Sequence, residues 1–319
     1  MRSFFKFFIP CQEAGARGRQ PAKRRPLHGL PRLLFAGLLL TWVSAAGAGE
    51  SGRYPDFQAE GDIRRFAGET LYFDISFLLF HQAATAEVHF FEKDGVYRAR
   101  LVAQTKGFIG LLTSYRQHIY ETTFEVIDGG RRLRATSFLR QVTNGNRHER
   151  TEHTFDYARR WHHWTLYVNG EATENDKEPI PQGVSFDDVL TAFYNFRNSV
   201  YGPVTPGVKY SIHTVPEMGH DTIEVDVHTE AEAERERQAI GRSAEGELLI
   251  DIIVPKEIFN TETGHIRLWS SPHLIPVESI IEDYILLGDL HANFSRREMK
   301  KTGNPPPAVT SQGEGNAPG

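Results

Sequence analysis

Most of the chain from residue 71 onward alternates between apolar and polar residues with a period of two, which is typical of strands that bury one face. Turn residues separate successive segments, such as Asp94-Gly95, and an Asp-Gly pair favours a tight hairpin. We predict strands at 71–77, 86–90, 96–102, 117–127, 132–141, 147–157, 160–168, 209–215, 222–228, 248–254, 265–270, 277–284 and 286–294. Roughly a dozen strands at this spacing predict a mainly β fold, either an antiparallel curved sheet or a barrel-like sandwich.

One segment has the spacing of a helix instead. Apolar residues recur there every three or four positions, which indicates a helix with one apolar face: Phe186, Val189, Leu190, Phe193 and Phe196. Ser185 is the expected N-cap, and Asp188 completes a capping arrangement with it. We therefore predict one amphipathic helix over about 185–199, packed on the sheet. A second helical turn within 231–238 is polar on all sides, so we expect an exposed connection there.

The N-terminal part has the pattern of an export signal. Residues 33–43 are apolar and uncharged, basic residues precede them, and Ala46-Gly47-Ala48 offers the small residues that a signal peptidase reads. The alternative is a retained membrane anchor. Eleven helical residues at about 1.5 Å each cross only about half of a roughly 30 Å hydrocarbon core, which favours cleavage.

The chain is therefore expected to have three parts. We predict a signal peptide over 1–48, a single β-rich domain over 49–299, and a Pro/Gly-rich disordered tail over 300–319. The mature protein would have no stable transmembrane anchor. We expect it to be exported to the periplasm of a Gram-negative bacterium, or associated with the outer membrane.

Cleavage would change the charge and the redox chemistry of the chain. Of the 36 Lys and Arg and the 41 Asp and Glu, eight basic and one acidic residue lie in 1–48, which leaves 28 basic and 40 acidic residues and a formal net charge of −12. Such a charge opposes binding to nucleic acid or to an anionic membrane surface. The same segment contains the only cysteine, Cys11, so the mature chain would form no disulfide.

No catalytic motif is complete in the sequence. His148 and His153 are five positions apart, whereas the two histidines of a zincin helix are four apart, and on a strand the two would point to opposite faces. We interpret the histidines as scattered surface or interface residues. The adjacent carboxylates of Asp187 and Asp188 are better explained as capping charges at the positive end of the helix dipole. We predict no catalytic residue, no metal site and no cofactor.

Two features are candidates for function. An apolar run at 107–112 contains Phe108, Ile109, Leu111 and Leu112. We expect a buried strand end, because isolated exposed apolar patches are uncommon; the alternative is a mobile apolar loop at a pocket mouth or at a partner-binding spot. Glu69 directly precedes a strong strand, and we expect it to form an ion pair inside the sheet rather than to bind a cation.

Three stretches resemble motifs of a known family. Residues 67–75 resemble an opening strand with the pattern GE-x-L-x-Y, and residues 185–197 resemble a helix with the pattern D-x-L-S-x-x-Y-x-x-R, with Thr191 in place of Ser. Residues 264–277 resemble a late strand, turn and strand with the pattern W-x-S-x-D-x-x-x-P-V. The matching positions include Glu69, Tyr72, Asp188, Tyr194, Arg197, Trp269 and Pro276.

These motifs are similar to those of the bacterial exported domain-of-unknown-function 3108 family, over roughly residues 60–297. The chain departs from the family at the turn, where Ser271-Pro272-His273 replaces the usual acidic residue. The resemblance implies an envelope location and a β-rich fold, and it brings no established reaction or ligand. The matching residues also have a structural interpretation, because Asp188 and Arg197 could fix the helix to the sheet by charge-assisted hydrogen bonds.

Three functions are compatible with these features. The first is non-enzymatic binding of a lipid or other amphiphile in a groove of the sheet, motivated by the strand-rich pattern, the abundant Phe and Tyr, and the lack of a catalytic motif. The second is a protein–protein assembly module that binds another envelope protein through a sheet edge or the run at 107–112. The third is a hydrolase of envelope polymers, whose acid and base would come from distant strands.

Overall fold

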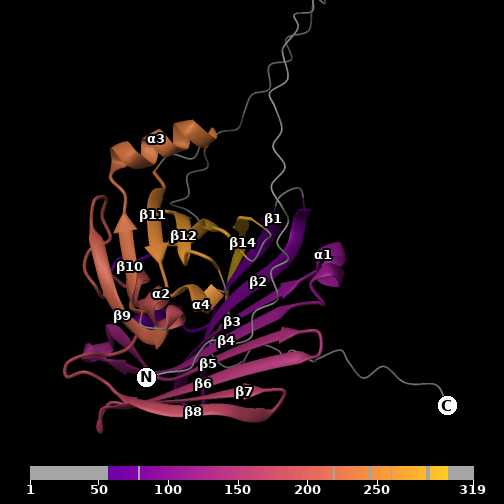
Figure 1. Ribbon diagram of the computed structural model, residues 1–319. Helices are drawn as coiled ribbons and strands as arrows, with labels where there is room; N and C mark the ends of the chain where they lie inside the picture. Colours follow the sequence, from indigo (N-terminus) through magenta and orange to yellow (C-terminus); the bar gives the residue numbers. More distant parts are fainter. Residues whose placement is uncertain are drawn as a thin grey trace, which may run out of the picture. The chain divides into compact units, whose positions relative to one another are not determined.

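A computed structural model describes residues 57–77, 80–217, 220–243, 246–259, 261–284 and 288–300 (Figure 1). The expected signal peptide over 1–48 lies outside the described residues, and so does all of the expected tail except Lys300. The described part is mainly β, with fourteen antiparallel strands in one sheet. Its strands are β1 Glu69–Phe77, β2 Phe80–Lys93, β3 Val96–Thr105, β4 Gln117–Ile127, β5 Arg132–Asn144, β6 Arg147–Asp156, β7 Trp161–Val168, β8 Glu171–Pro179, β9 Lys209–Glu217, β10 His220–Val227, β11 Leu248–Ile253, β12 His265–Ser270, β13 Pro276–Ile281 and β14 Leu290–Met299.

The helices are short. They are η2 Ile63–Phe66, α1 Gly107–Leu112, η3 Asp128–Gly130, α2 Val189–Arg197, α3 Glu230–Ile240 and α4 Lys256–Phe259. None of the helices in the described ranges is long and apolar enough to cross a membrane.

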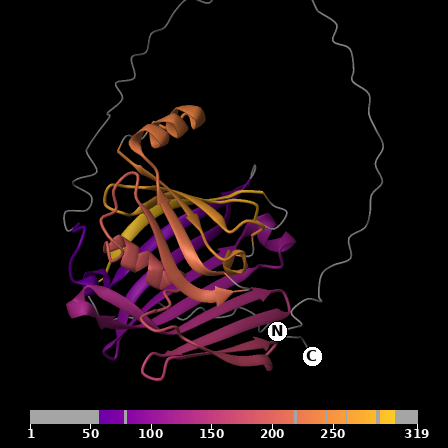
Figure 2. The same cartoon turned by 60° about the vertical axis from the view of Figure 1, so that its left-hand side comes forward.

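The sheet is built as two arms that meet at the first and last strands. β1 pairs with β2 on one side and with β14 on the other, and its register runs from Glu69 opposite Met299 to Phe77 opposite Leu290. From this seam one arm continues in order to β8 and the other runs back from β14 to β9. The two ends of the series, β8 and β9, do not pair with each other, so the sheet is curved but not closed (Figures 1 and 2).

The space between the arms is filled by one apolar core. Aromatic side chains from the first arm, such as Phe90 and Tyr120, belong to the same cluster as aliphatic side chains from the second, such as Val225 and Ile250. α2 lies between the arms, because it contacts β3, β4 and β5 while the ring of Phe196 lies 6.2 Å from that of Tyr210 on β9. The sequence-based prediction of a mainly antiparallel β fold with one packed helix is confirmed.

One strand was not predicted from the sequence. β8 is the outermost strand of the first arm and reads EATENDKEP, and most of its residues are exposed. Alternation of apolar and polar residues requires one buried face, and β8 has none. Charged side chains on an exposed edge strand also oppose pairing with another chain.

The helix expected at 185–199 is present but begins later. α2 starts at Val189, and its N-cap is Asp188, which accepts hydrogen bonds from the backbone N–H groups of Leu190 at 3.0 Å and Thr191 at 3.4 Å. Ser185 is therefore not the N-cap. The expected apolar stripe is also only part of the buried surface, because polar residues such as Asn195 are buried as well. Asn195 donates from Nδ2 to the carbonyl of Leu133 and accepts at Oδ1 from its N–H, both at 2.9 Å, which joins α2 to β5.

The polar segment near 231–238 forms α3, which is not exposed on all sides. Its residues Ala233 and Arg237 are buried, and Ala233 packs with Leu249 and Trp269. The guanidinium carbon of Arg237 lies 5.7 Å from the centre of the Trp269 ring. α3 therefore covers the indole of Trp269, and a cation–π contact replaces the apolar face that the sequence lacks.

Candidate functional site

A buried carboxylate with two arginine partners lies where β1 and β14 meet the end of α2. Glu69 is fully buried, and it accepts two hydrogen bonds from Arg197, Nη1–Oε2 at 2.5 Å and Nη2–Oε1 at 3.0 Å. Arg297 on β14 donates from Nε to Oε1 of the same carboxylate at 2.7 Å. The ion pair expected for Glu69 is thus present, and it connects the first strand, the last strand and the central helix.

The two arginines determine the charge state of Glu69. Burial alone would raise the pKa of a carboxyl group, because the charged form loses its water. Here the charges and hydrogen bonds of Arg197 and Arg297 outweigh burial and hold the pKa of Glu69 below its usual value. Glu69 is therefore a carboxylate at neutral pH.

A third guanidinium lies beside this ion pair. The ring of Phe66 contacts both Arg65 and Arg197, with the two guanidinium carbons 4.5 Å and 4.6 Å from the ring centre. Arg65 donates to the side-chain oxygen of Asn198 and to the backbone carbonyls of Asp62 and Gln58. All of these acceptors are neutral. Burial, and then the charge of Arg197, lower the pKa of Arg65, so the two cations are held close together in a partly desolvated place.

The three arginines, Arg65, Arg197 and Arg297, line a small pocket. Its volume is about 90 Å³. The remaining lining residues are mostly apolar or aromatic and include Phe57, Phe66, His273, Ile275 and Met299. The pocket thus joins cationic hydrogen-bond donors to an apolar rim, of which Phe57 and Met299 are exposed.

The pocket gathers some of the positions identified by the motifs. Glu69, Tyr194 and Arg197 come together, since the guanidinium carbon of Arg197 lies 5.6 Å from the centre of the Tyr194 ring. Burial and the charge of Glu69 raise the pKa of Tyr194, which keeps its hydroxyl protonated. From the third motif, His273 and not an acidic residue reaches the pocket, where its ring meets Phe57 edge-on at 4.9 Å.

The other motif positions lie elsewhere. Asp188 is at the opposite end of α2, Trp269 is covered by α3, and Pro276 opens β13 next to Ser270. Tyr72 on β1 lies under the guanidinium of Arg296, 3.6 Å from its carbon to the ring centre. Sequence reasoning missed Arg65 and Arg297 at the site. Neither lies in a motif, and only the pairing of β1 with β14 brings Arg297 to Glu69.

A second polar cluster surrounds the start of α2. Asp187 accepts hydrogen bonds from Tyr201 Oη at 2.6 Å, Arg132 Nη2 at 2.9 Å and Asn195 Nδ2 at 3.3 Å. Burial raises the pKa of Asp187, and it raises the pKa of Asp188 to about 6. The two residues are only 0% and 2% exposed, so a polymer cannot reach their carboxylates. They fix α2 to the sheet rather than face a substrate cleft.

The expectation that the histidines are scattered on the surface is wrong for three of them. His89, His153 and His162 are buried. His153 Nδ1 and His162 Nε2 share a hydrogen bond of 2.9 Å, and His162 Nδ1 lies 2.9 Å from Glu178 Oε1 on β8. Burial, followed by the charge state of His162, lowers the pKa of His153 to about 3. The pairing of β6 with β7 brings the two histidines together. The turn between these strands is the sequence signal from which that pairing could have been predicted.

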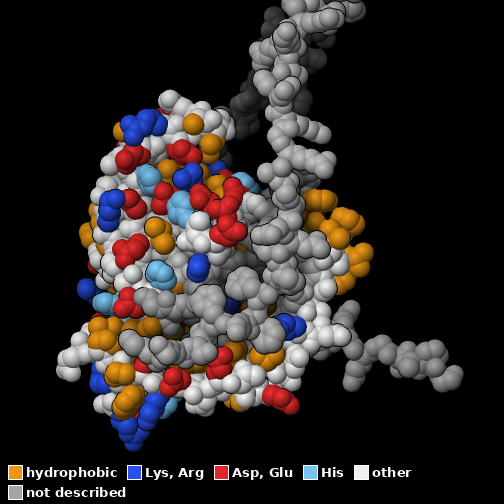
Figure 3. Space-filling view, in the orientation of Figure 1, with side chains coloured by type: hydrophobic (Ala, Val, Ile, Leu, Met, Phe, Trp, Pro, Cys, Tyr) orange, Lys and Arg blue, Asp and Glu red, His pale blue; other side chains and the backbone are white. Residues whose placement is uncertain are grey.

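The apolar run at 107–112 forms α1, which corrects the expectation of a buried strand end. Phe108, Leu111 and Leu112 are 60%, 65% and 65% exposed, and Ile109 and Gly110 are buried. Figure 3 shows apolar side chains gathered where α1 lies in Figure 1. No structural observation assigns a partner to them.

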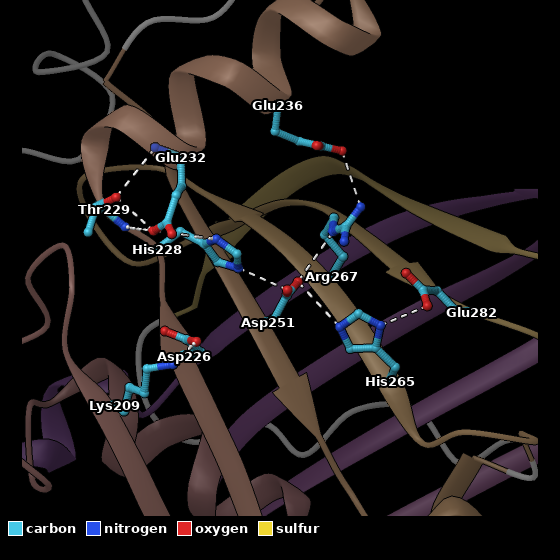
Figure 4. A network of polar contacts seen from close by, with 10 residues as sticks. All are labelled: Lys209, Asp226, His228, Thr229, Glu232, Glu236, Asp251, His265, Arg267 and Glu282. Carbon is cyan, nitrogen blue, oxygen red and sulfur yellow. Dashed lines mark hydrogen bonds and ion pairs between the residues drawn. The ribbon is translucent and has the colours of Figure 1, made fainter.

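A network of charges ties α3 to the strands below it. Asp251 on β11 accepts from His228 Nε2 at 2.8 Å and Arg267 Nε at 3.2 Å, and it lies 3.4 Å from His265 Nε2. Arg267 also donates to Glu236 on α3 at 3.2 Å. Ten residues are drawn in Figure 4: Lys209, Asp226, His228, Thr229, Glu232, Glu236, Asp251, His265, Arg267 and Glu282. Each carboxylate of this group has a Lys, Arg, His or hydroxyl partner, and no arrangement of metal ligands occurs in the described part of the chain.

The fold defines an all-β protein with a single open antiparallel sheet. No family model and no curated protein matches the chain. Among solved structures, the chain is similar to the crystal structure of a beta-barrel-like protein of the domain of unknown function DUF1849 from Brucella abortus. The two sequences are 12% identical, the match covers 74% of this chain and 99% of that chain, and the TM-score is 0.41. Nothing about function follows from a likeness at this level.

Proposed function

We propose that this chain is a non-enzymatic binding protein of the cell envelope that holds the anionic head of a lipid or a similar amphiphile. The single observation that carries the proposal is the position of Arg65. Among the described residues, this cation has only neutral hydrogen-bond acceptors, and it lines a pocket together with Arg197 and Arg297. A carboxylate or phosphate is the group that guanidinium donors bind most strongly.

The size and lining of the pocket favour a head group over a whole lipid. A pocket of about 90 Å³ lined by three arginines suits a carboxylate or a phosphate better than an acyl chain. The chain of the ligand would leave the pocket across the exposed side chains of Phe57 and Met299, next to buried Ile275. Membership of the domain-of-unknown-function 3108 family and export by the segment at 1–48 are part of the same proposal.

The turn at His273 also favours an anionic ligand. Where the family that the chain resembles has an acidic residue, this chain has Ser271-Pro272-His273, and His273 lines the pocket. A carboxylate at that turn would repel an anionic head at close range. The replacement therefore favours an anion over a cation as the bound group.

Calorimetric titration with two probes tests the proposal. Dodecyl phosphate and dodecanol, each below its aggregation concentration, have the same chain and differ in the charge of the head. We expect dodecyl phosphate to bind one molecule per protein and dodecanol to bind about tenfold more weakly or not at all, as expected for charge-assisted hydrogen bonds. Equal affinity for both probes, or no binding of either, would contradict the proposal.

A matched pair of variants locates the binding. Arg65→Gln removes the charge at the pocket, and Arg159→Gln removes an 83% exposed guanidinium that pairs with Asp156 after β6. We expect about a tenfold loss of dodecyl phosphate affinity in the first variant and no change in the second. Equal effects of the two substitutions would place the anion outside the pocket.

A further inference from the structure

A second surface, at the other end of β1, has properties that the pocket does not explain. Five of the ten large apolar side chains that are exposed in the described ranges lie there: Phe80, Phe108, Leu111, Leu112 and Tyr115. The rings of Phe80 and Phe108 are stacked with centres 6.1 Å apart, and the ring of Tyr115 lies against Gly110 of α1. We call these five residues the α1 tip (Figure 3).

The α1 tip is fixed to the sheet by apolar packing and hydrogen bonds. Ile109 is buried and packs with Phe77 and Ala83. Thr113 donates from its hydroxyl to the carbonyl of Ile109 at 2.8 Å, and the Gly145 N–H of the next hairpin donates to Ser114 at 3.2 Å. The exposed side chains are therefore presented by an ordered support.

The end of α1 bonds much of its backbone internally. The N–H groups of Gly110, Thr113, Ser114 and Tyr115 all donate to carbonyls within 106–111. Internal bonding of these four groups lowers the cost of placing the end of α1 against an apolar phase. The first turn has no such help, since its N-cap Lys106 makes no side-chain capping hydrogen bond.

The hairpin ends around the α1 tip contain no carboxylate. Residues 75–86, 101–120 and 141–148 contain no Asp or Glu, and they contain Lys106, Arg116 and Arg147, although the whole chain has more acidic than basic residues. Arg147 pairs with Glu149, which lies just beyond these ranges. The adjoining segment contains Glu282, which pairs with His265 at 2.7 Å, as well as Asp283 and Asp289. A net negative charge opposes an anionic surface at long range, but charges beyond about 8 Å are largely screened at physiological ionic strength.

We infer that the α1 tip docks the protein on the surface of a lipid bilayer. Leu and Phe side chains would enter the boundary between head groups and acyl chains, Tyr115 would lie at the head-group level, and Lys106 and Arg116 would meet anionic heads. The absence of carboxylates from the three hairpin ends supports lipid as the occupant, because a carboxylate near an anionic surface is repelled.

Docking at the α1 tip is separate from binding at the arginine pocket. The pocket is lined by Arg197 and Arg297, which bind Glu69, and the α1 tip lies beyond Phe77, so the two are at opposite ends of β1. Eight residue steps at about 3.3 Å separate the two ends by about 26 Å. The two inferences can therefore fail independently.

Flotation with vesicles tests the docking. Vesicles of phosphatidylcholine and phosphatidylglycerol in equal parts are mixed with the whole protein and floated on a density gradient. We expect the unmodified protein to float. Leu111→Ser with Leu112→Ser should lower partitioning by about tenfold or more, since two leucines leave the apolar boundary.

The control removes apolar surface elsewhere. Ile240→Ser with Ile253→Ser changes two side chains of similar exposure, 52% and 51%, on α3 and β11. It should float like the unmodified protein. If the Leu111 and Leu112 variant does not fold, Phe108→Ser supplies the same test. Failure of the unmodified protein to float would overturn the inference, and so would equal flotation of the α1 variant. Either result is also what a surface that binds another protein, and not lipid, would give.

Discussion

Arg197 on α2 and Glu69 on β1 form a two-point ion pair across 128 positions of the chain. Both side chains are buried, at 3% and 0% exposure. The pair fixes the last turn of the central helix to the first strand of the sheet. The guanidinium of Arg197 also lies over the ring of Phe66, which the guanidinium of Arg65 contacts as well. The same contact therefore stabilises the fold and shapes the arginine pocket.

The first prediction concerns the stability that this pair confers. Glu69→Gln leaves the buried Arg197 and the partly exposed Arg297 near a neutral amide, and removal of one partner from a buried pair costs about 3 kcal/mol or more. Urea denaturation of both proteins measures the difference. Arg197→Met combined with Glu69→Gln should lose less than the sum of the two single changes, because the partners act together. A loss below about 0.5 kcal/mol for Glu69→Gln would show that the pair contributes little.

The second prediction concerns the N-cap of α2. Burial raises the pKa of Asp188 from 3.8 to about 6, so the folded state binds this proton more tightly than the unfolded state. The free energy of unfolding therefore falls as the pH rises from about 4 to about 6, by about 3 kcal/mol from this group. Asp188→Asn keeps a capping oxygen but does not titrate, and it should gain stability relative to the unmodified protein over that window. A difference that is constant with pH would contradict the raised pKa.

The third prediction concerns acid stability. Burial, followed by neighbouring cations, lowers the pKa of His118 from 6.5 to about 3, and that of His153 is lowered equally. The unfolded chain binds these protons first, so stability is complete above about pH 6.5 and falls below it by about 1.4 kcal/mol per pH unit for each histidine. His153→Phe should remove one of these contributions. Its stability relative to the unmodified protein should rise as the pH falls from 6 to 4, and a flat difference would refute the assignment.

The fourth prediction concerns the seam between β1 and β14. Gly68 has a φ of +93°, and a Cβ there would lie 1.9 Å from the carbonyl oxygen of Lys300. Gly68→Ala should cost about 2 kcal/mol or more, because the backbone of β14 must move. Gly95→Ala is the control, since its φ is +76° but nothing lies within 4 Å of a Cβ. It should cost only about 1 kcal/mol in thermal or urea unfolding. Equal losses would show that the contact with Lys300 is easily relieved.

The strands could be predicted wherever one face is buried. The strand predicted over 117–127 has the same bounds as β4. It could be recognised because alternate residues of this segment face the core. β8 could not be predicted, since both of its faces are solvated and no periodicity remains. The start of α2 was placed too early because Ser185 also fits a capping pattern, and only the observed hydrogen bonds identify Asp188 as the N-cap.

The candidate site could be predicted only in part. The resemblance to a family identified Glu69 and Arg197, but not that they bond to each other and to Arg297. Arg65 lies in a short helical turn before β1, where no pattern distinguishes it from any solvated arginine. Its importance arises from Phe66 and Arg197, which only the folded chain brings beside it.

The central claim is that the pocket at Arg65 binds an anionic head group, and a crystal structure of the complex with dodecyl phosphate tests it most directly. We predict a phosphate oxygen within about 3.2 Å of a guanidinium nitrogen of Arg65, with the first part of the dodecyl chain against Phe57 and Ile275. A complex in which the phosphate is bound elsewhere, and the space between Arg65, Arg197 and Arg297 contains no part of the ligand, would contradict the claim.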